Sequence, residues 1–200
     1  MSLQAYFPAD RVDLDGLGRH LDALAPTARL EAVRTLGRRE QSRLFEAAHG
    51  KRKITLADFV PPAVGPMREV IHDGRNTLPA FRNFQKRFCR PDDGSPDALW
   101  GYNEQTMGFA TGPGYFVTKP WNDEGVDGVV IDYHDVPPRH PEGWPDIVPN
   151  SARLGRFVYA RMRDVMRGVS AHVSVGRAHK DGKWMDAWFV LCRDDRAAGG

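Results

Sequence analysis

The first half of the chain places its apolar residues at helical spacing. From Leu14 to Leu24, leucines recur every three or four positions, and Asp13 stands where its carboxylate can cap the first turn. Because the apolar stripes are thin, we expect these helices to pack on a larger body rather than to fold alone. The same spacing predicts further short helices over residues 26–36, 41–48 and 55–60.

The stretch that follows combines a strand pattern with a helix pattern. Residues 67–74 are strand-like, and the pair Asp73-Gly74 is typical of a turn. Residues 79–88 predict a helix that begins with proline in its first turn. That helix would place three aromatic residues on one face, namely Phe81, Phe84 and Phe88.

Beyond residue 99 the pattern changes to strands. Residues 99–121 carry six aromatic rings around the turn Gly112-Pro113-Gly114, which predicts a β-hairpin, and residues 129–133 predict another strand. A second hairpin joins residues 172–178 to residues 184–192 through an Asp-Gly turn. Successive residues of its last strand alternate between two apolar faces. This alternation suits a strand that lines an interior on one side and is covered by a helix on the other.

Two segments interrupt this strand-rich half. Residues 137–150 contain five prolines and predict an irregular loop, either a lid or a packed surface loop. Residues 151–169 fit a helix or a strand. All five tryptophans lie beyond residue 99, and residues 91–96 form a polar hinge. We therefore expect a helical region over 1–91 that packs on an antiparallel β-barrel domain over 92–200.

Composition narrows the classes of function. The formal net charge of +2 gives no general attraction to nucleic acid, so we expect no nucleic-acid partner. The first residues lack the basic and apolar parts of an export signal, and no apolar run approaches the roughly 20 residues that span a bilayer. We expect a cytoplasmic protein with no membrane span, in which Cys89 and Cys192 are buried, reduced thiols.

Several separated groups of residues in the second half carry a family resemblance. Leu99-Trp100-Gly101 opens the first strand after the hinge, and Asp132-Tyr133 ends a central strand. Residues 164–167 then lead through Val175-Gly176-Arg177 to the closing segment 189–193. This series resembles bacterial lipocalin-like small β-barrels. The resemblance implies an antiparallel sheet that closes, or nearly closes, around an apolar interior filled by side chains or one small ligand. With the helical region before it, the expected fold class is α+β.

Aromatic density without a nucleophile or metal motif favours a binding function. We hypothesise that the barrel holds a small apolar or aromatic molecule, with aromatic side chains supplying surface and polar ones orienting its polar end. No cofactor is expected, and the sequence does not indicate an oligomeric state. The predicted ligand-binding residues are Trp100, Tyr102, Asn103, Gln105, Tyr115, Tyr133, His134, His172, Trp184 and Trp188.

Two alternatives stay open at this point. The same barrel would serve an isomerase, cyclase or hydratase, with His134 or His172 as acid and base and Asp132 as the orienting carboxylate. A protein-interaction scaffold would instead contact its partner through the basic helical region and would contain no ligand cavity.

The other titratable residues indicate neither a metal site nor a further catalytic group. The histidines lack the close spacing of a metal site, so no metal is expected, and a haem would take His172 or His134 as its axial ligand. Asp164 and Arg167 are three residues apart, which suggests a structural pair within one turn.

Overall fold

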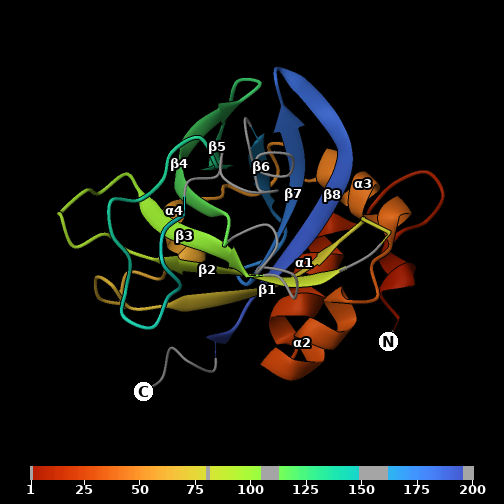
Figure 1. The fold of residues 1–200 in the computed structure, drawn as a ribbon. Coiled ribbons are helices and arrows are strands. Elements are labelled where there is room, and N and C mark those ends of the chain that lie inside the picture. Colours follow the sequence, from red (N-terminus) through yellow and green to blue (C-terminus); the bar gives the residue numbers. More distant parts are fainter. Residues whose placement is uncertain (1, 80–81, 105–112, 149–161, 196–200) are drawn as a thin grey trace.

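Eight antiparallel strands close into a barrel in the computed structural model, which describes residues 2–79, 82–104, 113–148 and 162–195 (Figure 1). Each strand pairs with the next, and the last strand pairs with the first. The expected architecture, a helical N-terminal segment followed by an antiparallel barrel, is therefore confirmed. The strands are β1 (Val70–Asn76), β2 (Asn83–Cys89), β3 (Leu99–Glu104), β4 (Tyr115–Asp123), β5 (Val126–Asp132), β6 (Met162–Gly168), β7 (Val173–Lys180) and β8 (Lys183–Arg193).

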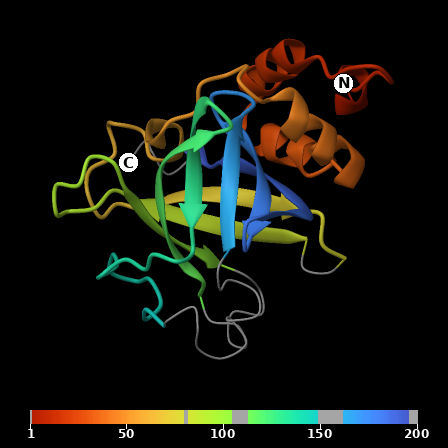
Figure 2. The same cartoon turned by 90° about the horizontal axis from the view of Figure 1, so that it is seen from above.

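Short helices precede the barrel, as the leucine spacing predicts. Asp13 caps the first α-helix through a hydrogen bond from the Gly16 backbone N–H to its Oδ1 at 3.0 Å. The helices α1 to α3 lie together beside the barrel (Figure 2), where their apolar faces pack on outward-facing valines of β5 to β8. The helical elements are η1 (Leu3–Tyr6), α1 (Leu14–Ala23), α2 (Pro26–Val33), α3 (Arg38–Ala47) and α4 (Leu56–Phe59).

The alternation of side chains along each strand separates an inner from an outer apolar layer. In β8, Phe189 and Leu191 belong to the inner cluster, whereas Val190 packs with the helices outside. Ile54, just before α4, and Phe59 within it also belong to the inner cluster, so this short helix closes one end of the barrel.

Phenylalanine rings of the interior lie directly over glycines on neighbouring strands. A Cβ atom added at any of three glycines would lie 2.3–2.4 Å from such a ring, so these positions are glycine for reasons of space. Each ring thereby fills volume that a second side chain would otherwise occupy. The pairs opposite each other in register are Gly74 with Phe84, Gly101 with Phe116, and Gly176 with Phe189.

Replacing Gly101 by alanine is expected to lower the free energy of unfolding by about 1–3 kcal/mol, because the interior becomes overpacked. The new Cβ would lie 2.3 Å from the Phe116 ring and 2.4 Å from the Arg87 carbonyl oxygen, which belongs to the backbone. Gly128→Ala in β5 is the matched control, since its Cβ would meet no atom closer than 3.7 Å. Urea unfolding of both variants measures the difference, and equal losses would contradict this account of the glycine.

Three expectations for the middle of the chain are corrected. Residues 83–89 form β2 rather than part of a helix, because alternate residues from Phe84 to Phe88 face the barrel interior. The pair Asp73-Gly74 lies within β1 and makes no turn. Since β1 and β2 belong to the barrel, the barrel begins at Val70 and not at residue 92.

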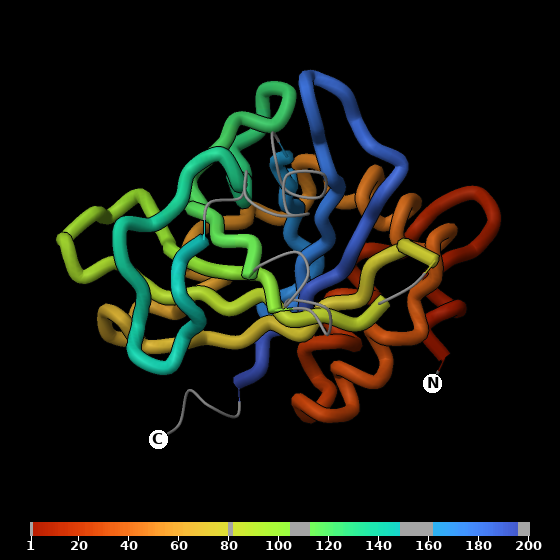
Figure 3. The backbone as a smooth tube through the Cα atoms, in the orientation of Figure 1, coloured from red at the N-terminus to blue at the C-terminus, as the bar shows by residue number. Residues whose placement is uncertain are grey.

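The structure shows the conformation of parts of two further segments, residues 151–169 and the proline-rich residues 137–150. Residues 162–168 form strand β6, and residues 151–161 lie outside the described part. Residues 133–148 contain no helix or strand, and Trp144 within them is buried. Figure 3 shows this segment, in teal, running along the outside of the green strands. Over its described residues this segment is packed on the barrel surface through Trp144. None of the described helices has the length and apolar character needed to cross a membrane.

Candidate functional site

A buried lysine occupies the barrel interior. Lys86 of β2 has only 3% of its side chain exposed, and its Nζ lies 3.0 Å from Oδ2 of Asp164 on β6, which is 4% exposed. The same Nζ donates a hydrogen bond to the Tyr133 hydroxyl, which itself lies 3.5 Å from that carboxylate oxygen. These three side chains form a polar centre, hereafter the Lys86 centre, inside a largely apolar barrel.

Aromatic rings surround the Lys86 centre. The Nζ atom lies 4.9–5.7 Å from the centroids of four rings, close enough for cation–π attraction to a charged amine. Burial nevertheless lowers the pKa of Lys86 from its usual value, and the Asp164 carboxylate opposes that shift. The rings belong to Phe84, Phe116, Tyr133 and Phe189.

Further polar groups line the same interior. His72 of β1 stands opposite Lys86 in register and donates from Nε2 to the Phe59 carbonyl oxygen at 2.9 Å. Burial lowers the pKa of His72 to about 4, so the ring is neutral near pH 7. Within the described residues, Nδ1 of His72 and Oγ1 of Thr118 have no hydrogen-bond partner. Both side chains are almost fully buried, so these atoms are available to a polar group that enters the interior.

The predicted ligand-binding residues divide between the two sides of the barrel wall. Tyr133 packs with the inner cluster, whereas Trp188 belongs to the outer one and Trp184 packs against it. The Arg177 guanidinium lies 5.2 Å from the Trp184 ring and 4.9 Å from the Trp188 ring. The guanidinium of Arg38, on α3, also lies 5.3 Å from the centroid of the Trp188 ring. These two tryptophans therefore join the helices to the barrel.

A second outer group contains the aromatic residues of the β3–β4 hairpin. Trp100, Tyr102 and Tyr115 cluster with Trp144 of the proline loop, and the Tyr102 and Trp144 rings are 4.9 Å apart. This cluster anchors the loop. Asn103 is buried at the interior-facing position of β3 opposite Lys86, while Gln105 lies outside the described residues.

Asp132 and His134 meet on the outer surface, as their spacing predicts. His134 Nδ1 lies 2.7 Å from Asp132 Oδ1, and the histidine side chain is 40% exposed. Burial alone would raise the pKa of Asp132, but hydrogen bonds from His134, Lys119 and Arg163 outweigh burial and hold that pKa below its usual value. The arrangement leaves His134 Nε2 as the atom that would exchange protons with a substrate. The same carboxylate also ties together three strands, through Lys119 on β4 and Arg163 on β6.

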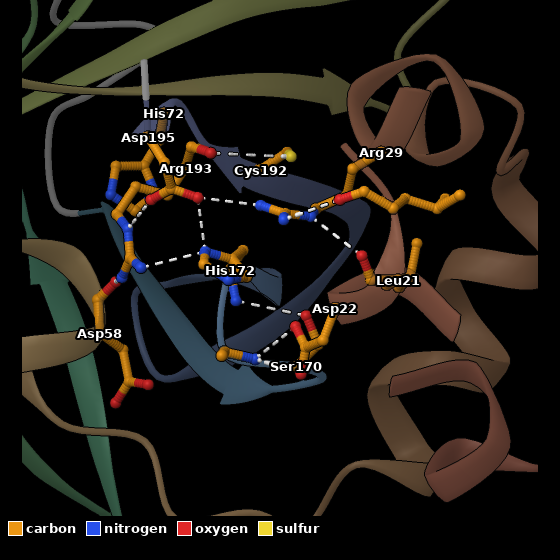
Figure 4. A network of polar contacts seen from close by, with 12 residues as sticks. Leu21, Asp22, Arg29, Asp58, His72, Ser170, His172, Cys192, Arg193 and Asp195 are labelled. Carbon is orange, nitrogen blue, oxygen red and sulfur yellow. Dashed lines mark hydrogen bonds and ion pairs between the residues drawn. The ribbon is translucent and has the colours of Figure 1, made fainter. Parts of the chain in front are cut away.

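His172 belongs to a network near the α4 end of the barrel (Figure 4). Its Nδ1 lies 2.6 Å from an Asp195 oxygen and 3.1 Å from a nitrogen of Arg193. Arg29 of α2 reaches the same aspartate at 2.9 Å. Burial lowers the pKa of His172, and Arg29 and Arg193 add to this effect while Asp195 opposes it. The network holds the end of β8 against the helices and does not include His134.

The structure assigns no metal site to these histidines. Among the described residues, no group of three or more His, Cys, Asp or Glu side chains lies close enough to hold a metal ion. Cys89 and Cys192 are free and buried, and burial raises the pKa of each thiol to about 12. An open groove of about 800 Å³ on the outer surface lies between residues 63–70 and 141–144, away from the Lys86 centre.

Sequence analysis missed Lys86 as a site residue. The sequence signal that could have revealed it is its position midway between Phe84 and Phe88. If this segment is a strand, residues 84, 86 and 88 share one face, and all three side chains are large and face the interior. The three-residue spacing predicts Asp164 only as a partner for Arg167. The structure instead places the two on opposite faces of β6, with Arg167 bound to Asp123 at 2.7 Å.

Comparisons with known proteins add little to this geometry. No protein-family model matches the chain, and no curated protein matches it. One solved structure, a point variant of the vaccine antigen transferrin binding protein B from Actinobacillus pleuropneumoniae, is similar with a TM-score of 0.30 and 7% identity. The match covers 66% of this chain and 64% of that chain, so less than two thirds of the similar protein is spanned.

Proposed function

We propose that this protein is a small-molecule-binding protein with a lipocalin-like barrel. Its ligand would be an apolar, aromatic or conjugated molecule that carries one polar oxygen. Apolar parts of the ligand would contact the rings of the interior, and the oxygen would bind at the Lys86 centre. The outer-face tryptophans have no part in this proposal, because arginines and the helices already cover them.

The observation that supports this function is the charged pair buried within the aromatic interior. Exchanging a buried ion pair for apolar residues of similar volume is often neutral or even stabilising, so folding alone gives little reason for Lys86 and Asp164. The unpartnered atoms of His72 and Thr118 also support a binding function, since buried polar atoms are normally hydrogen-bonded. A ligand with a polar group would satisfy such atoms.

The direction of entry follows from the closed end of the barrel. Ile54 and Phe59 close the end next to His72, so a ligand would approach from the opposite end, where Tyr133 follows β5. On that route the Phe84 ring, which precedes Lys86 on β2, comes before the Lys86 amine. Binding would then require this ring to shift, which fits an elongated ligand better than a bulky one.

A panel of fluorescent or absorbing probes tests the proposal. We expect cis-parinaric acid, retinol or quercetin to gain fluorescence on binding and to raise Tm. A probe at 100 times its Kd adds about 2.7 kcal/mol to the free energy of unfolding. Emission of the protein's tryptophans is a poor reporter, because those described as buried lie on the outer face.

Two variants locate the bound probe. Tyr133→Phe removes an interior hydroxyl and is expected to weaken binding roughly tenfold, the effect of one lost hydrogen bond. Trp184→Phe on the outer face is the matched aromatic control and should leave Kd unchanged. The proposal fails if no probe binds, or if only the outer-face variant alters binding.

A further inference from the structure

Lys86 has the surroundings of a lysine that reacts with carbonyl groups. Its amine is buried beside a carboxylate at 3.0 Å and a phenolic hydroxyl, within a set of aromatic rings. Lysines are rarely buried so completely, and a neutral amine is the nucleophile in imine chemistry. The lowered pKa of Lys86 increases the neutral fraction of its amine.

We propose, resting on the proposed function, that the ligand is an aromatic or conjugated aldehyde that Lys86 binds covalently as an imine. The three groups of the Lys86 centre have separate roles in this bond. Lys86 supplies the nitrogen, Tyr133 moves a proton, and Asp164 accepts a proton and then stands as the counter-ion. The surrounding rings would pack along the conjugated chain.

The reaction balances without an oxidant or a reductant. The Lys86 ammonium first gives a proton to Asp164. The neutral amine then attacks the carbonyl carbon, a C–N bond forms, and the carbonyl π electrons move to oxygen. A proton passes from nitrogen to that oxygen through the Tyr133 hydroxyl and gives a carbinolamine. The nitrogen lone pair next forms the C=N bond, and the C–O bond breaks as Asp164 returns its proton, so that one water leaves.

The geometry also accounts for retention of the product. A protonated imine at Nζ keeps its positive charge at the place where the ammonium now lies, 3.0 Å from Asp164. The charge therefore keeps its partner in a site where an unpaired charge would be costly. Substitution of Asp164 by asparagine is expected to lower the pKa of the imine, which is visible as a shift in its absorption with pH.

The test uses the full chain, all-trans-retinal and sodium cyanoborohydride, followed by intact mass measurement and peptide mapping. We expect a single main adduct, heavier by the aldehyde less one oxygen atom, on Lys86. Lys86 should carry more adduct than any exposed lysine, because burial lowers the pKa of its amine and leaves more of it neutral. Lys86→Arg should remove this adduct, and Lys119→Arg, at a partly exposed surface site, should not.

Retinol separates the two proposals, because it has the same chain but no carbonyl group. Adduct spread evenly over surface lysines, with retinol still bound, overturns the imine and leaves the binding function standing. Absence of binding by both retinol and retinal overturns both proposals. The peptide map of the unaltered chain decides the matter even where Lys86→Arg fails to fold.

Discussion

Replacing Asp164 by alanine is expected to lower the free energy of unfolding by about 3–5 kcal/mol, because it leaves the Lys86 charge buried without its partner. The side chains of both residues are 3–4% exposed, so water cannot replace the lost contact. The loss should shrink as the pH rises, because an unpaired buried amine escapes the cost by giving up its proton. Urea unfolding at two pH values measures both effects.

A double variant shows why Asp164→Ala lowers stability. The loss arises either because the Lys86 charge is left unpaired or because the ion pair itself stabilises the fold. Lys86→Met combined with Asp164→Leu fills the same space with apolar groups and is expected to recover most of the stability lost by either single variant. The exposed pair of Arg139 and Asp92 is the control, where Asp92→Ala should cost at most about 1 kcal/mol. A double variant as unstable as Asp164→Ala would show that the pair itself stabilises the fold.

The elements that sequence predicts best are those with one unambiguous local signal. The leucine spacing and Asp13 define α1, and Asp181-Gly182 between two β-rich runs defines the β7–β8 hairpin. Closure of the barrel is not local. It depends on β8 pairing with β1, more than a hundred residues earlier in the chain, and no short pattern indicates that contact.

The main wrong prediction, a helix over residues 79–88 in place of β2, arises from a residue spacing that fits both a helix and a strand. Phe84 and Phe88 are four residues apart, which places them on one face of a helix and equally on one face of a strand. Asp164 and Arg167 are three residues apart, and for this spacing the two structures differ. Residues three apart are neighbours on a helix, but they lie on opposite faces of a strand. Once β2 is taken as a helix, Lys86 between the two phenylalanines looks like a solvated residue. The candidate site is thereby lost with the strand.

The placement of the aromatic residues shows a second limit. Both faces of β8 are apolar, and sequence does not say which of them is inside. The face with Trp184 and Trp188 is the outer one, because α3 brings Phe45 to 5.8 Å from Trp184 and Arg38 to Trp188. Helices earlier in the chain thus decide which aromatic residues of β8 face the barrel interior.

Acidification is expected to destabilise the protein through His72. The folded-state pKa of His72 is about 4 against 6.5 for an unburied histidine, so below pH 6.5 the unfolded chain binds a proton that the folded chain refuses. Stability is therefore complete above that value and is lost progressively as the pH falls toward 4. Between about pH 7.5 and about pH 5 the loss from this residue is about 2 kcal/mol. Urea unfolding at both pH values gives the change.

The replacement His72→Gln isolates this contribution, because glutamine keeps an N–H group for the Phe59 carbonyl oxygen but does not titrate in this range. Its stability should vary about 2 kcal/mol less over the same interval than that of the unaltered chain. His172→Gln is the comparison, since that histidine is 24% exposed and its lowered pKa acts in the same direction with a smaller effect. The groups that face His72 electrostatically are Arg193, Asp195 and Asp58, with Lys86 opposite in register. An unchanged pH dependence in His72→Gln would mean that the ring accepts a proton inside the barrel, and that its unpartnered Nδ1 is reached by water.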